Sequence, residues 1–194
     1  MVSNDHGIFI REIVWKGFDF GFFFSWSYGN DVLNANRLVF ENGTKLNLEN
    51  VVIDDAGITG TNGTINFKGS NAINAPITLS GTSNILNGTT VLNGLVDNQT
   101  INLGENGGTE SGTIKFGPNG LLGANSIIVN NVANSVLDTQ NGKIDETTIA
   151  SLTLNGKMKL NIDASLSGEG SADRIISDAV TASENSLVVD KINV

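Results

Sequence analysis

The sequence contains no cysteine, so the chain can form neither a disulfide nor a thiolate metal site. This absence fits a cytosolic protein as well as a bacterial surface protein that must cross the periplasm. Histidine occurs once, at His6, which argues against a serine-histidine triad and against a histidine-rich metal centre. No run of 18 apolar residues is present, which excludes a transmembrane helix, and we expect no membrane insertion by this chain.

Charged residues are also scarce. They make up 16% of the 194 residues, with 11 Lys and Arg against 20 Asp and Glu, and the formal net charge is -9. Nucleic acids and anionic lipid surfaces normally require a cluster of basic residues, whereas here these residues are scattered from Arg11 to Lys191. We therefore expect no nucleic-acid partner. The hydrophobic content of 39% is that of a folded chain with a substantial core.

Asn-Gly dipeptides and short runs of alternating apolar and polar residues are frequent, whereas charged residues and helix formers are scarce. Asn-Gly begins at Asn42, Asn62, Asn87, Asn93, Asn106, Asn119, Asn141 and Asn155. Between these dipeptides lie runs in which apolar and polar side chains alternate, a pattern typical of strands. The runs are 37–40, 45–48, 64–67, 77–79, 90–92, 100–103, 113–116 and 126–129.

Two all-β architectures could use this pattern: an antiparallel sandwich with Asn-Gly hairpins, or a β-solenoid in which each strand stacks on its equivalent one turn later. The starts of the central strands lie about 10 to 13 residues apart, which is too far for two-residue hairpins and suits two or three strands per solenoid turn. We therefore favour the solenoid. Asn side chains at equivalent positions could then form hydrogen-bonded ladders along the axis.

Composition and spacing divide the chain into three parts. Residues 1–36 hold most of the aromatic residues and are interpreted as a hydrophobic cap over the first coil, or a damaged upstream segment, rather than an aromatic ligand-binding surface. Residues 37–135 are predicted as solenoid coils. Residues 136–194 are predicted as a C-terminal module, in which 149–154, Asn155-Gly156 and 157–162 form a β-hairpin cap and 174–176 and 187–192 are closing strands.

The acidic residues give no convincing catalytic or metal site. Asp54 and Asp55 are adjacent, so in a strand they would point to opposite faces, whereas acid-base catalysis requires convergent carboxylates. Asp145 with Glu146, and Asp163 with Asp173, could bind calcium, but their loops lack regular ligand spacing. We predict no catalytic residue, no cofactor-binding residue and no metal ligand.

Two loop motifs are interpreted structurally. The Gly-rich segment 104–112 lacks the lysine and the helix of a phosphate-binding loop, so we expect a long coil corner. The Asn-x-Thr sequons at Asn42, Asn62, Asn87 and Asn98 are explained by turns that lead into strands.

The segment 152–166, followed by Ser171-Ala-Asp-Arg-Ile-Ile176 and Leu187-Val-Val189, resembles the C-terminal end of bacterial autotransporter passenger domains. The Asn-Gly-Thr-Ile-Asn-Phe style of repeat is similar to the Asn- and Thr-rich surface antigens of that family. The resemblance implies a right-handed parallel β-helix at the bacterial cell surface or secreted, with a C-terminal module that promotes folding during export. We recognise neither a signal peptide nor the family's translocator segment, so we expect the chain to be a passenger fragment.

These observations lead to a functional hypothesis. We expect a non-enzymatic surface fragment with a structural or adhesive role, which contacts a host-cell surface protein or glycan. A polysaccharide lyase or hydrolase on the same scaffold is the alternative, and it requires groups such as Asp54, Lys68 and Lys115 to converge in one groove. A phage or fibre module is a third alternative.

Overall fold

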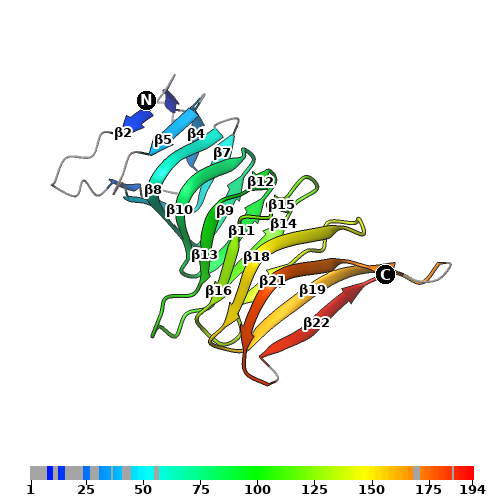
Figure 1. Ribbon diagram of the computed structural model, residues 1–194. Coiled ribbons are helices and arrows are strands. Elements are labelled where there is room, and N and C mark those ends of the chain that lie inside the picture. Colours follow the sequence, from blue (N-terminus) through cyan, green and yellow to red (C-terminus); the bar gives the residue numbers. More distant parts are fainter. Residues whose placement is uncertain are drawn as a thin grey trace, which may run out of the picture.

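The computed structural model describes the backbone of the strands at 8–10, 13–15, 24–26, 31–35 and 37–40, and residues 45–54, 57–167, 171–184 and 186–194. These residues form two sheets, and the strands of each sheet stack one after another along a common axis (Figure 1). Sheet A contains, in spatial order, β1 (Ile8–Ile10), β4 (Asp31–Ala35), β7 (Val51–Asp54), β9 (Ser70–Ile73), β11 (Gly88–Leu92), β14 (Gly112–Phe116), β17 (Val136–Asp138) and β19 (Met158–Ser165), with β20 (Ser171–Ala172) and β22 (Leu187–Asn193) beside β19.

Sheet B follows the same axis. Its main path is β2 (Ile13–Trp15), β5 (Arg37–Phe40), β8 (Gly57–Lys68), β10 (Ile77–Ile85), β13 (Gln99–Leu103), β16 (Ile127–Asn130), β18 (Glu146–Leu154) and β21 (Arg174–Ala182). Shorter strands lie beside this path: β3 (Phe24–Trp26), β6 (Lys45–Glu49), β12 (Leu95–Val96) and β15 (Leu121–Leu122).

The chain winds between the two sheets as a β-solenoid. Successive strands of one sheet come from successive turns, and every pairing among the described residues is parallel except that of β19 with β20. The predicted all-β parallel solenoid is therefore confirmed, and an antiparallel sandwich is excluded because consecutive coils run in the same direction. The right-handed winding stays a prediction, which agrees with the strong preference of parallel crossovers for that hand.

Each turn uses two or three strands, as the spacing predicted. In one coil β8 supplies all of sheet B and β9 supplies sheet A, whereas a later coil uses β12 and β13 in sheet B and β14 in sheet A. The long strand β10 explains the difference, because its first half pairs with β12 and its second half with β13. A register shift at Ser80/Gly81 marks the bend between these halves.

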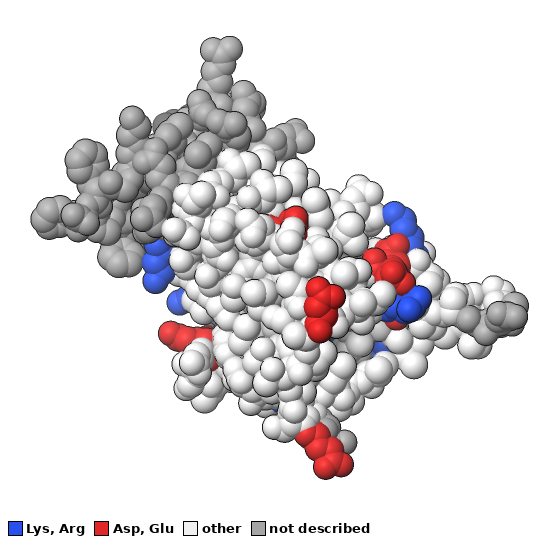
Figure 2. All heavy atoms as spheres, in the orientation of Figure 1, with Lys and Arg blue, Asp and Glu red and all other residues white. Residues whose placement is uncertain are grey.

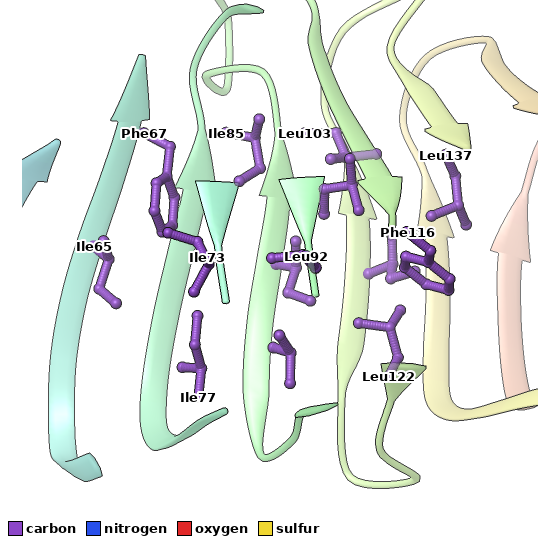
Figure 3. Packing of buried hydrophobic residues seen from close by; sticks show 14 of the residues in the cluster. Ile65, Phe67, Ile73, Ile77, Ile85, Leu92, Leu103, Phe116, Leu122 and Leu137 are labelled. Carbon is purple, nitrogen blue, oxygen red and sulfur yellow. The ribbon is translucent and has the colours of Figure 1, made fainter. Parts of the chain in front are cut away.

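A continuous apolar core fills the space between the sheets (Figure 3). Phe67, Ile85 and Leu103 occupy equivalent positions in sheet B, and Ile73 and Leu92 face them from sheet A. Side chains alternate across each strand, so every second residue joins this core while its neighbours face outward. Burial of apolar surface at about 25 cal/mol per Å² is the main stabilising term for such a stack.

The predicted hairpin at 149–162 is wrong in its position. β18 pairs in parallel with β16 and β21 in sheet B, while β19 pairs in parallel with β17 and β22 in sheet A, so Asn155-Gly156 is a corner between sheets. The dipeptide suits both uses, since a tight change of direction requires the same backbone freedom in each. A C-terminal hairpin does exist, but it joins β19 to β20 and pairs Ala164 with Ala172.

The predicted closing strands are confirmed as β21 and β22, each paired on one side within the described residues. The stack of sheet A passes from β14 to β17 without interruption, and the division at residue 136 stays a prediction. In the first 36 residues β1 pairs in parallel with β4. The aromatic side chains of that segment lie outside the described residues.

Candidate contact surface

A ladder of asparagine side chains follows the outer face of sheet B. Asn47, Asn66, Asn84 and Asn102 occupy equivalent positions in four successive strands. Each amide Nδ2 donates to the Oδ1 of the preceding coil, at 2.7 Å from Asn66 to Asn47, 2.7 Å from Asn84 to Asn66 and 2.7 Å from Asn102 to Asn84. The ladder predicted from the Asn excess is confirmed at this position.

A row of threonines lies parallel to the asparagine ladder. Thr64, Thr82 and Thr100 are in register across β8, β10 and β13, two residues before the ladder asparagines in each strand. Strand geometry places neighbouring coils about 4.8 Å apart and the two rows roughly 6.7 Å apart. The motif Thr-x-Asn therefore repeats in three successive coils on one outward face. In the preceding coil Lys45 occupies the position of the threonine, and in the following coil Ile127 occupies it.

Each row borders a hollow. The threonine row lines a groove of about 430 Å³ together with Asn62, Ser80, Asn98 and Asn125. The asparagine ladder lines a second groove of about 490 Å³, which also includes Lys45, Glu105, Asn106 and Asn131. The first groove has no charged lining residue, and the second has Lys45 and Glu105.

The distribution of charge over the molecule agrees with this local composition. In the orientation of Figure 1, the middle of the visible face carries few charged side chains (Figure 2). Amide and hydroxyl groups can both donate and accept hydrogen bonds, so such a face can bind uncharged polar partners without the strong salt dependence of a charged interface.

A buried polar pair joins β10 and β13 under the threonine row. Ser83 Oγ donates to Gln99 Oε1 at 2.7 Å, and Gln99 Nε2 donates to the Leu79 carbonyl oxygen. Gln99 lies opposite Gly81 in the neighbouring strand. Sequence reasoning missed this pair, because Gln99 follows an exposed Asn and looks like part of a polar turn.

The acidic residues at the C-terminal end meet in space, as the sequence allowed for Asp163 and Asp173. Asp163 Oδ2 accepts from the backbone N–H groups of Asn141 and Gly142, both at 2.7 Å, and its Oδ1 accepts from Asn193 Nδ2 at 2.6 Å. Asp173 accepts from the backbone N–H groups of Asp145 at 2.9 Å and Asp163 at 2.8 Å.

These contacts show that the two carboxylates fasten backbone segments to one another. Burial raises the pKa of Asp163, but the hydrogen bonds from the Asn193 side chain and from the backbone of Gly142, Asn141 and Lys143 outweigh it, so its pKa lies below the ordinary value. Glu146 pairs instead with Arg174, at 2.9 Å on the surface. Within the described residues no group of three or more His, Cys, Asp or Glu side chains is placed to hold a metal ion.

The three residues named for the enzyme alternative are divided between the two sheets. Asp54 belongs to β7 and Lys115 to β14, both in sheet A, whereas Lys68 ends β8 in sheet B. β9 and β11 separate β7 from β14, so Asp54 and Lys115 are three strand spacings apart, about 14 Å. His6 and Asp55 lie outside the described residues.

The Gly-rich segment and the sequons at Asn87 and Asn98 lie between strands, whereas Asn62 lies within β8. The Gly-rich segment connects β13 to β14, which confirms the predicted long corner. Asn62 and Asn98 are exposed with φ of 51° and 60°, in the left-handed conformation that asparagine tolerates. Asn87 accepts a hydrogen bond from the Gly69 N–H at 2.9 Å. Asn42 lies outside the described residues.

No helix in the described part of the chain is long and apolar enough to cross a bilayer. Comparison of the chain with protein-family models, with curated proteins and with solved structures gave no match in any of the three. The solenoid is thus shown by the strand pairing of this chain.

Proposed function

We propose that this chain is a non-enzymatic β-solenoid fragment of an autotransporter-like passenger, which contacts molecules on host or neighbouring cells through the outer face of sheet B. The observation that carries the proposal is the Thr-x-Asn motif, repeated in register over three coils and bordered by two polar grooves. The bacterial cell surface, or secretion from it, is the proposed location.

The chemistry of the face indicates the kind of partner. Asn66 and Asn84 each use one N–H and one oxygen lone pair in the ladder, and the second N–H of the half-buried Asn84 is left to meet a ligand. The threonines add hydroxyl groups and methyl groups at the same spacing. A neutral, hydroxyl-rich glycan or an uncharged polar protein surface matches these groups, whereas phosphate-rich polymers gain nothing from a chain of net charge -9.

A binding assay with matched variants tests the proposal. Labelled protein is applied to cells and to a glycan array, alongside Thr82→Lys in the centre of the face and Thr113→Lys on the outer side of sheet A. Both threonines are half-buried strand residues with parallel neighbours on each side. We expect Thr82→Lys to weaken binding about tenfold or more, because an uncompensated charge enters the contact, and Thr113→Lys to leave it unchanged.

Two results would contradict the proposal. Absence of binding to cells, matrix proteins and glycans would remove the adhesive role. Binding that Thr113→Lys weakens as much as Thr82→Lys would place the contact elsewhere on the molecule.

A further inference from the structure

The Gly-rich corner between β13 and β14 contains the most accessible Asn-Gly dipeptide in the described residues. Asn106 and Gly107 are both exposed, and Gly107 has a φ of 77°. A Cβ atom added to Gly107 would meet no heavy atom within 4 Å. The N–H of Gly108 closes the turn by donating to the Glu105 carbonyl oxygen at 2.8 Å, and the N–H of Gly107 has no hydrogen-bond acceptor among the described residues.

We propose that Asn106-Gly107 is a site of spontaneous deamidation, which converts Asn106 to aspartate or isoaspartate in the folded protein. The Gly107 backbone nitrogen attacks Cγ of Asn106 and forms a new C–N bond while the Cγ–Nδ2 bond breaks. The proton from Gly107 leaves with Nδ2 as ammonia, and a five-membered succinimide remains. Water then opens either carbonyl of this ring, so one water is consumed, one ammonia is released and no redox partner is needed.

This reaction requires freedom at both ends of the dipeptide. The Asn side chain must rotate until Cγ meets the next backbone nitrogen, and that nitrogen must be able to leave its hydrogen-bonded place. Within the described residues neither the Asn106 side chain nor the Gly107 N–H has a hydrogen-bond partner. The local motion can therefore occur without unfolding of a coil.

In two other Asn-Gly dipeptides the attacking nitrogen is held. The Gly142 N–H donates to Asp163 Oδ2 at 2.7 Å, and the amide of Asn141 donates to Asp145 Oδ2 at 2.8 Å. The Gly120 N–H donates to the Gly117 carbonyl oxygen at 2.9 Å. Reaction at either site requires these bonds to break first.

In the remaining described dipeptides the side chain or the strand is held. Asn87 donates to Glu110 at 2.9 Å, Asn93 donates to Asn74 at 2.6 Å and Asn155 donates to Asn131 at 3.2 Å. Gly63 lies inside β8, opposite Gly81. The inter-coil contacts that stabilise the solenoid thus also protect its asparagines, and the loop that leaves the coil path is the exception.

The reaction changes the candidate contact surface. Asn106 and Glu105 both line the groove beside the asparagine ladder, so the product adds a second carboxylate to the lining of that groove. The protein would acquire this negative charge slowly and irreversibly as it ages. The chemistry itself needs no ligand and is independent of the proposed adhesive role.

Timed peptide mapping by mass spectrometry tests the proposal on the full chain, kept folded at mildly alkaline pH. We expect acid at position 106 to accumulate about tenfold or more faster than at 119 or 141, since those sites react only through locally opened states. In denaturant the rates at these sites should converge, because the dipeptide is the same. Asn106→Gln should abolish the early acid in the peptide that contains residue 106, and Asn119→Gln should leave that acid in place.

Equal rates at positions 106, 119 and 141 in the folded protein would overturn the proposal. Acid that accumulates earlier at position 119 or 141 than at position 106 would also overturn it.

Discussion

Asparagine serves two different roles in this protein, and position in the strand decides between them. On the outer face of sheet B the amides of Asn66, Asn84 and Asn102 bond to one another from coil to coil. At corners, asparagine instead tolerates positive φ, as at Asn50, which has a φ of 55° and accepts a hydrogen bond from the Ser70 N–H. The excess of Asn over Lys and Glu therefore reflects both coil stacking and turning.

Asn84→Asp tests the contribution of the ladder. The carboxylate cannot donate to Asn66 Oδ1, so two acceptor oxygens would face each other at the place of a 2.7 Å hydrogen bond. We expect the free energy of unfolding to fall by about 1–3 kcal/mol. Thr78→Asp, at an exposed position of the same strand, should change it by less than about 0.5 kcal/mol. Equal losses in urea denaturation would show that the ladder adds no stability.

Gly81→Ala tests the close approach of the chain at the bend of β10. An added Cβ would lie 2.1 Å from the Gly63 carbonyl oxygen, a backbone atom of the neighbouring coil. The two coils would have to separate locally, and we expect a loss of about 1–3 kcal/mol. Gly57→Ala meets no atom within 4 Å and is the control. A thermal midpoint that is unchanged by Gly81→Ala would contradict the described backbone contact.

At the scale of elements, short strands owe their stability to stacking on the coils before and after. β12 and β15 have only two residues each, yet they lie in register because their neighbours in sheet B are already ordered. Sequence reasoning located most strands, since alternation marks a face that is half buried. Among the strands that it missed are β7, β9, β12, β15 and β17, which have two to four residues each and are too short to give a periodic signal.

The hydrogen-bonded carboxylate of Asp163 at the C-terminal end should make the stability of the fold depend on pH in the acidic range. Because the pKa of Asp163 is lowered in the folded state, the ionised form contributes stability above the unfolded value of 3.8. That contribution is lost as pH falls below this value and through the folded pKa.

Unfolding free energies measured between roughly pH 5 and pH 2 check this response. Asp163→Asn should be less stable than the parent at neutral pH and should lose less stability on acidification. Asp178→Asn, at an exposed position of β21, is the carboxylate-to-amide control. Parallel pH profiles for the parent and Asp163→Asn would show that Asp163 contributes nothing to acid sensitivity.

At the scale of the whole molecule, coil spacing was enough to predict a parallel solenoid. The spacing could not predict whether the chain at each Asn-Gly dipeptide turns back as a hairpin or passes to the other sheet. The dipeptide suits both, and at Asn155-Gly156 the chain passes from sheet B to sheet A. Only part of the candidate contact surface could be predicted from the sequence. Alternation placed Thr64 and Asn66 on the polar face, but their alignment with Thr82 and Asn84 depends on coil lengths that only the fold fixes.

Distances between spin labels test the central claim of parallel, in-register coils most directly, and the chain has no cysteine to interfere with labelling. Lys45, Ser151 and Ala179 occupy equivalent outward positions in sheet B, with Ser151 five coils and Ala179 six coils from Lys45. At about 4.8 Å per coil, Lys45→Cys with Ser151→Cys should give roughly 24 Å, and Lys45→Cys with Ala179→Cys roughly 29 Å. Distances that are equal, or that shorten for the pair with Ala179→Cys, would contradict the stacked solenoid.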